Sequence, residues 1–172
     1  MNNKNLKRYF QFFLIVLAAG SIFPIIYLKT NYQQTLLQVF NMTLPQLNSI
    51  YSILGIVWLV GYFPSGLISD KFSAKWLLSI SLFGVAAAGF WFAQIPSYKN
   101  VVVIYGIWGI FSVFTFWSAH MKIVKLLAKK KEEGRFFGIL DGGRGVVEAL
   151  LASLALYIFT KVMGGSTNLA NN

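Results

Sequence analysis

The stretch GYFPSGLISDKFSAK, residues 61–75, decides the fold of this chain. It contains the end of one apolar run and a very short polar turn with Asp70, Lys71 and Lys75, and a second apolar run begins at Trp76. Apolar helices joined by so short a charged turn cross the same apolar layer in opposite directions. The stretch therefore predicts a membrane hairpin.

Five apolar runs are each long enough to cross about 30 Å of hydrocarbon as a helix of about 20 residues. They cover residues 10–28, 47–69, 76–95, 101–121 and 136–160. Of the 172 residues, 56% are hydrophobic and 12% charged, which is too few polar residues for the surface of a soluble domain. We expect an all-α polytopic bundle in a lipid bilayer, with residues 1–172 forming one transmembrane unit.

Composition also limits the chemistry. The chain has no cysteine, one histidine and five carboxylates, which leaves little material for a metal centre or an acid/base active site. We expect no metal, no cofactor and no enzymatic activity.

Thr43 and Gln46 form a capping-box pattern with Pro45 between them, which predicts that the second helix begins there.

The net charge of +10 follows a topological pattern. If the N-terminus is cytoplasmic and the spans alternate, inside segments hold eleven of the fifteen Lys and Arg residues, and outside segments hold three, Lys29, Lys99 and Lys161. This positive-inside bias predicts a cytoplasmic N-terminus and accounts for the basic charge without a nucleic-acid partner.

The turn after the second run resembles the cytoplasmic loop signature of the major facilitator superfamily. Gly66, Asp70, Lys71 and Lys75 match that signature, whereas Ser73 stands where the family usually has glycine and Ala74 where it usually has a basic residue. The resemblance implies that these four residues form a latch to the opposite half of a carrier. The alternative is a solvated turn with positive-inside lysines.

The resemblance covers the whole chain, with a long outer loop after the first helix and a basic loop after the fourth. It implies an N-terminal half of about five helices, from which the sixth helix and the C-terminal bundle are absent. Its partners would be the C-terminal half of the carrier, a small-molecule solute and a proton or other coupling ion. The resemblance also implies that the protein is located in an inner, or cell, membrane.

The fifth run carries charges inside a membrane helix, where charges usually face a cavity or a partner. Counted from Phe136, Arg144 lies about 12 Å deep and Glu148 about 18 Å deep. Arg144 and Glu148 are four residues apart on one face, with Asp141 three residues before Arg144. They form either an internal ion pair that lowers the cost of insertion or a site where Arg144 meets an anionic group and Glu148 carries a proton.

Two further patterns are candidates for function. The glycines Gly138, Gly142, Gly143 and Gly145 suit either a sliding helix interface or static packing. In the fourth run Tyr105, Trp108, Ser112 and Thr115 recur at helical spacing and suit either a polar solute or packing. We expect His120, near the end of that run, to be interfacial rather than a proton relay.

The leading hypothesis is a secondary active transporter, such as a proton symporter, that moves a sugar or organic anion by alternating access. The alternative is a non-transporting membrane scaffold or a half-transporter that needs a partner. A membrane enzyme would need clustered His, Asp or Glu residues at one membrane face, and the sequence lacks such a cluster.

Overall fold

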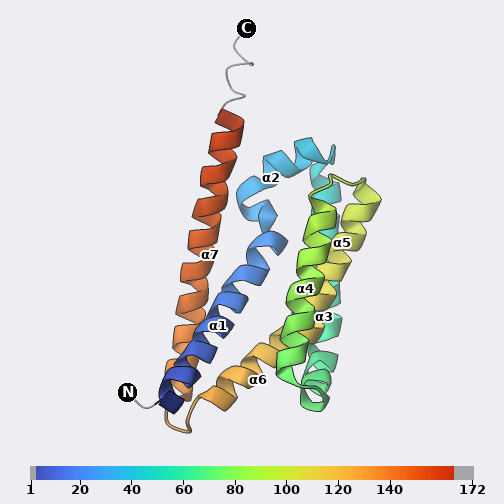
Figure 1. Ribbon diagram of the computed structural model, residues 1–172. Helices are drawn as coiled ribbons and strands as arrows, with labels where there is room; N and C mark the ends of the chain where they lie inside the picture. Colours follow the sequence, from blue (N-terminus) through green and yellow to red (C-terminus); the bar gives the residue numbers. More distant parts are fainter. Residues whose placement is uncertain (1–2, 165–172) are drawn as a thin grey trace.

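The computed structural model describes residues 3–164 and is helical, without strands, over that range (Figure 1). Its elements are α1 (Asn3–Ile26), α2 (Leu28–Val39), α3 (Leu44–Lys71), α4 (Ala74–Phe92), α5 (Tyr98–Ile110), η1 (Phe111–Trp117), α6 (Ser118–Leu127) and α7 (Glu133–Gly164). Within the described range, these elements form five helical rods, some of them made of two or three consecutive elements, that are long and apolar enough to cross a membrane. The expected all-α polytopic bundle is therefore confirmed.

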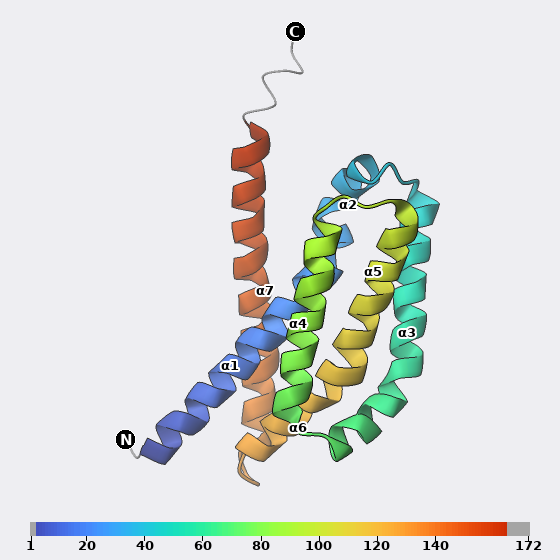
Figure 2. The ribbon, with the colours of Figure 1, turned by 45° about the vertical axis from the view of Figure 1, so that its right-hand side comes forward.

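Helix α1 lies between α7 and the helices of the third and fourth spans. Helix α1 packs against α7 on one side and against α4 and α6 on the other, while α5 packs against both α3 and α4 (Figures 1 and 2). The start of α1, the end of α6 and the start of α7 lie at one end of the bundle. Helix α2 and the turn from α4 to α5 lie at the other end.

The N-terminus of α3 has the predicted capping box. The Thr43 hydroxyl accepts from the Gln46 backbone N–H, the Gln46 side chain accepts from the Thr43 N–H at 2.8 Å, and Pro45 lies in the first turn. These bonds satisfy amide donors that a helix start otherwise leaves free. The sequence prediction of this helix start is confirmed.

The first span is longer than the apolar run and is broken at Tyr27. Residues Asn5–Val39 form one candidate span, but Tyr27 leaves helical geometry with φ −93° and ψ 25°. The Tyr51 hydroxyl of α3 bridges this break, because it donates to the Ile26 carbonyl at 2.9 Å and accepts from the Lys29 N–H at 3.0 Å. A side chain from another helix thus replaces the hydrogen bonds that the break removes.

The fourth span, Tyr98–Leu127, contains the π-helical segment η1 between α5 and α6. Its wider turn engages both neighbouring spans: Trp58 Nε1 of α3 donates to Ser112 Oγ at 2.9 Å, and Ser81 of α4 and Thr115 share a hydrogen bond of 2.6 Å. Single π-helical turns occur often at functional sites. Here the segment supplies Val113 and Trp117 to the cavity described below.

Helices α1 and α7 approach each other closely at Gly20. A Cβ on Gly20 would lie 2.5 Å from Val147 Cβ and 2.9 Å from the Arg144 carbonyl oxygen, so only glycine fits there. Gly143 of α7 faces Val16 of α1 in the same interface. Glycine contacts of this kind let membrane helices pack tightly without a hydrophobic driving force. The backbone that carries Arg144 is therefore fixed directly against α1.

Candidate functional site

A cavity of about 240 Å³ lies between α1, α3, η1 and α7, with Arg144 and Glu148 in its wall. Its lining comprises five aromatic side chains, one valine and the two charged residues, namely Phe23, Tyr27, Trp58, Tyr62, Val113, Trp117, Arg144 and Glu148. Two of the three charges expected within the fifth membrane helix, Arg144 and Glu148, thus face a cavity formed by three spans besides their own.

The two charges form an ion pair within one helix face. Arg144 Nε lies 3.3 Å from Glu148 Oε1, as the four-residue spacing predicts, and the two side chains are 33% and 37% exposed. Arg144 Nε nevertheless has no hydrogen-bond partner among the described residues, so the 3.3 Å separation is that of an ion pair rather than of an aligned hydrogen bond. The guanidinium also lies 5.8 Å from the centroid of the Phe23 ring.

The aromatic walls hold one another in place. The Trp58 ring meets Phe23 and Tyr27 edge to face at centroid distances of 6.4 and 5.8 Å, and Trp117 meets Tyr62 at 5.9 Å. Such edge-to-face pairs add about 0.5–1.5 kcal/mol each beyond their buried area. Because Trp58 also donates its indole N–H to Ser112, its orientation in the wall is fixed from two sides.

A second cavity of about 420 Å³ adjoins the first. It shares Phe23, Tyr27 and Glu148 with the first cavity and adds the polar residues Thr30 and Asn31 near the helix break. The remaining lining residues are Pro24, Gly145, Ala149 and Ala152. Glu148 and Tyr27 therefore stand at the boundary between an aromatic cavity that contains Arg144 and a more polar cavity toward α2.

The sequence did not single out the aromatic lining. Phe23 and Tyr27 are four residues apart in the first run, and Trp58 and Tyr62 are four apart in the second. This spacing places each pair on one helix face and was the available signal. Trp117 offered less signal, because the π-helical segment shifts the side-chain positions that an α-helix would predict.

The aromatic and hydroxyl residues expected in the fourth span lie elsewhere. Tyr105 and Trp108 are buried in the bundle core, where Trp108 Nε1 donates to the Val85 carbonyl at 3.1 Å. Ser112 holds Trp58, and Thr115 bonds to Ser81 and to the Phe111 carbonyl. None of the four lines the two cavities, although Ser112 lies behind the aromatic wall.

His120, which the sequence suggested to be interfacial, is buried among protein side chains. Only 2% of it is exposed, its ring stacks on Phe116 at 4.9 Å, and it meets Trp117 edge to face at 5.3 Å. Phe116 and Trp117 of the same span cover its ring, which position along the chain alone does not reveal.

The remaining candidates of the fifth span point away from the Arg144 cavity. Asp141 is exposed and does not line it. Among the glycines, Gly143 packs on Val16, whereas a Cβ on Gly138, Gly142 or Gly145 would meet nothing within 4 Å in the described structure. One glycine thus serves packing within the bundle, and three lie where another surface can approach.

The signature turn lies at the end of the bundle where the N-terminus lies. Asp70, Lys71 and Lys75 are exposed, and a Cβ on Gly66 would meet nothing within 4 Å in the described part of the chain. Lys122 of α6 donates to the Ser69 carbonyl at the last turn of α3. A cation suits this negative helix end, so the turn is fixed to the fourth span while its charged side chains stay accessible.

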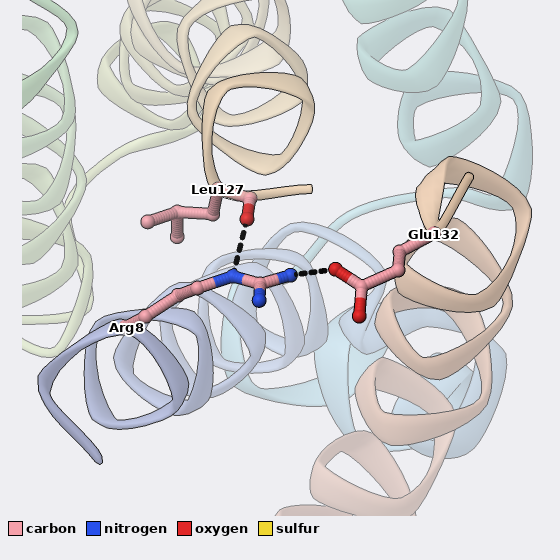
Figure 3. Close-up of polar contacts among 3 residues, drawn as sticks. All are labelled: Arg8, Leu127 and Glu132. Carbon is pink, nitrogen blue, oxygen red and sulfur yellow. Dashed lines mark hydrogen bonds and ion pairs between the residues drawn. The ribbon is translucent and has the colours of Figure 1, made fainter. Parts of the chain in front are cut away.

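Arg8 forms a polar contact that the sequence did not predict (Figure 3). Its Nε donates to the Leu127 carbonyl at 2.6 Å, its Nη2 bonds to the Glu132 carboxylate, and its guanidinium lies 4.7 Å from the Phe136 ring centroid. The hydrogen bond from Arg8 holds the pKa of the Glu132 carboxyl below its usual range. Arg8 thereby joins the starts of α1 and α7 to the end of α6.

Taken together, these features define a multi-pass helical membrane protein with a charged pair in an aromatic cavity between its spans. The model of the Major Facilitator Superfamily matches residues 9–165. The chain belongs to this family of transporters, as the signature turn predicted. No solved structure matches it significantly.

Several curated proteins are similar. The chain is 28% identical over 154 residues to the inner membrane protein YihN of Escherichia coli K12, covering 90% of the chain and 37% of YihN. It is 26% identical over 161 residues to the inner membrane protein YqcE of the same organism, covering 94% and 38%. It is 28% identical over 173 residues to the uncharacterized MG294 homolog of Mycoplasma pneumoniae, covering 92% and 36%. The chain thus spans less than two fifths of these relatives.

Proposed function

We propose that the chain is the N-terminal bundle of a secondary active transporter that moves a small polar solute, a sugar or an organic anion, by alternating access. The observation that carries the proposal is the Arg144–Glu148 pair, which faces a cavity between four elements rather than a sealed interface. Charges within a membrane span are costly and usually mark a solute or proton path. Membership of the major facilitator superfamily supports the same reading.

In this proposal Arg144 receives the polar group of the solute and Glu148 carries the coupling proton. Because the side chains lie 3.3 Å apart, protonation of Glu148 weakens its hold on Arg144, and a solute anion then takes its place. Asp141, exposed one turn before Arg144, lies outside this exchange and is a candidate for contact with another part of the carrier.

The proposed partner is the C-terminal half of the carrier. The relatives are more than twice the length that the chain covers, and Gly138, Gly142 and Gly145 leave the surface of α7 open to a second bundle. The exposed Asp70, Lys71 and Lys75 would form the latch to that half at the cytoplasmic face. The positive-inside bias supports this orientation, and the two relatives named as inner membrane proteins support that membrane as the location.

Proteoliposomes that contain the full-length protein and a trapped pH dye test the function. Gradients of glucose, glucuronate, gluconate and succinate are applied in turn, and we expect at least one to drive proton entry. Glu148→Gln should abolish that entry without changing membrane insertion, whereas the matched variant Glu133→Gln, outside the cavity, should retain it. Equal proton entry in Glu148→Gln would remove Glu148 from coupling. If none of the compounds drives proton entry, and none enters the proteoliposomes when it is isotopically labelled, the proposed transport of sugars or organic anions is contradicted.

A further inference from the structure

We infer that Ser65 and Ser81 are positioning residues for the Arg144 cavity, because they hold the π-helical segment η1 that turns Trp117 into the cavity wall. Neither serine lines either of the two cavities. The importance of the wall for the solute rests on the proposed function, whereas the orientation of Trp117 can be measured without transport. Two observations carry the inference: a change of the buried face along the fourth span, and buried hydrogen bonds that reach η1 from two other helices.

The face that the fourth span buries changes at η1. Residues seven apart lie two turns apart on one line of an α-helix. On one such line, Val103 and Ile110 of α5 are 50% and 48% exposed, whereas Val124 of α6 is completely buried. Trp117 is the member of this line between Ile110 and Val124, and it lines the Arg144 cavity. A straight α-helix would keep all four residues on one side, so α6 is turned relative to α5.

The π-helical geometry supplies this turn. Hydrogen bonds in a π-helix join residues five apart instead of four, so the segment Phe111–Trp117 holds an extra residue in its turn. One residue corresponds to about 100° around an α-helix. Without the segment, Trp117 would continue the exposed line of α5. With it, Trp117 lies edge to face with Tyr62 and Phe23, at centroid distances of 5.9 and 6.4 Å.

Two serines of neighbouring helices bond to the segment. Ser65 Oγ of α3 donates to the Val113 carbonyl at 2.7 Å. Ser81 of α4 shares a hydrogen bond of 2.6 Å with Thr115 Oγ1. Because π-helical turns are rare and the α-helix is the usual form of such a span, we attribute the wide turn to these bonds from outside the span.

The two bonds do not depend on a part of the carrier outside the described residues. Ser65 and Ser81 are 0% exposed and Val113 is 2% exposed, so the described helices already enclose them. A second bundle can add to the wall of the cavity. It does not reach the bonds that set the orientation of Trp117.

Fluorine NMR of the full-length protein in nanodiscs, labelled with 5-fluorotryptophan, tests the orientation through two ring contacts. The variants Trp117→Phe and Trp108→Phe assign the two signals. Tyr62→Leu should shift the Trp117 signal, because it removes the neighbouring ring. Phe92→Leu should likewise shift the signal of Trp108, which lies in α5 with its ring centroid 5.2 Å from that of Phe92. The second contact lies outside η1 and is the reference.

Removal of the two hydroxyl groups should loosen the first contact alone. In the background Ser65→Ala/Ser81→Ala, we expect the shift caused by Tyr62→Leu to be at least halved and the shift caused by Phe92→Leu to persist. An undiminished Tyr62→Leu shift would overturn the inference, because packing would then hold η1 without the serines. Equal loss of both shifts would also overturn it, since that result means a general loosening of the bundle.

Ser69→Ala is the matched control. Ser69 is a buried serine of α3 whose hydroxyl donates to the Gly66 carbonyl of its own helix at 3.1 Å, so its loss should change neither shift. A loss of the Tyr62→Leu shift as large as in the double variant would overturn the inference. If the double variant does not fold, Ser65→Ala and Ser81→Ala are measured singly, and an undiminished Tyr62→Leu shift in both has the same meaning.

Transport separates the inference from the proposed function. In the proteoliposome assay, Ser65→Ala/Ser81→Ala should raise the KM of the solute that drives proton entry at least threefold, and by more than it lowers the maximal rate. An unchanged KM would overturn the positioning role and leave the transporter standing. A halved Tyr62→Leu shift without proton entry for any of the four solutes would contradict the proposed function and support the orientation inferred for Trp117.

Discussion

Arg8, near the start of α1, bonds to the carboxylate of Glu132, which directly precedes α7 and lies 124 residues further along the chain. The same guanidinium donates to the Leu127 carbonyl at the end of α6. One side chain thereby ties three rods together at the end of the bundle where the N-terminus lies. Because Gly20 and Val147 pack closely further along the same pair of helices, α1 and α7 are joined at two levels.

Breaking this contact should loosen the bundle. Arg8→Gln removes the bonds to Leu127 and Glu132 and the stacking on Phe136, so we expect a lower free energy of unfolding, because hydrogen bonds to charged groups contribute more than neutral ones. Thermal unfolding in detergent measures it, with Lys7→Gln, the exposed neighbouring residue, as the control. A melting temperature equal to that of the control would show that the contact adds no stability.

The same contact should make stability depend on pH. Arg8 lowers the folded-state pKa of Glu132, so the contribution is fully present above the ordinary carboxyl pKa of 4.5 and is lost as pH falls through the lowered value. We expect the difference in unfolding temperature between wild type and Glu132→Gln to become smaller as the pH falls below about 4.5. Unfolding temperatures from pH 7 to pH 3 test this. A difference that stays constant over that range would contradict the linkage.

Gly20 should not tolerate a side chain. A Cβ there would meet Val147 and the Arg144 carbonyl at under 3 Å, so Gly20→Ala must push α7 away from α1, at a cost of about 1–3 kcal/mol. Gly55→Ala, where the new Cβ meets nothing within 4 Å, is the matched control. Unfolding followed by size-exclusion fluorescence compares them. Equal stability of the two variants would mean that α1 and α7 are not in close contact.

The Tyr51 hydroxyl should stabilise the break in the first span. Tyr51→Phe leaves the Ile26 carbonyl and the Lys29 N–H without this partner, and because both bonds are part-buried we expect a cost of about 1 kcal/mol, the lower end of the range for unsatisfied buried groups. Hydrogen exchange of residues 26–30 should become faster. Tyr105→Phe removes only the 3.3 Å contact between the two hydroxyls and is the control. Unchanged exchange in Tyr51→Phe would show that other contacts hold the break.

These contacts also show what the sequence can and cannot predict. Hydropathy located the five spans, local spacing predicted the Thr43 cap, and the four-residue interval predicted the Arg144–Glu148 pair, because each depends on neighbouring residues. The break at Tyr27 is completed by a hydroxyl 24 residues away, and Arg8 depends on a carbonyl 119 residues away. The cavity likewise requires side chains from α1, α3, η1 and α7 together. Only their arrangement in space shows such contacts.

Orientation can be measured with single cysteines, because the chain has none of its own. Lys71→Cys lies at the end of α3, just before the turn to α4, and Lys99→Cys lies at the start of α5 at the other end of the bundle. If the N-terminus is cytoplasmic, a membrane-impermeant maleimide should label position 99 in intact cells and position 71 only after permeabilisation. The reverse pattern would invert the proposed topology.

The charged turn after α3 supplies the last test. Asp70 is exposed and forms no ion pair within the described residues, while Lys122 holds the Ser69 carbonyl immediately before it. If Asp70 latches to the other half of the carrier, Asp70→Asn should slow solute-driven proton entry by about tenfold, a coupling of about 1.4 kcal/mol. Asp70→Glu keeps the charge and should recover part of the rate. Lys122→Gln would loosen α3 without touching the carboxylate, so it should lower the melting temperature more than Asp70→Asn does. Full transport activity in Asp70→Asn would leave the turn as a solvated connection between two spans.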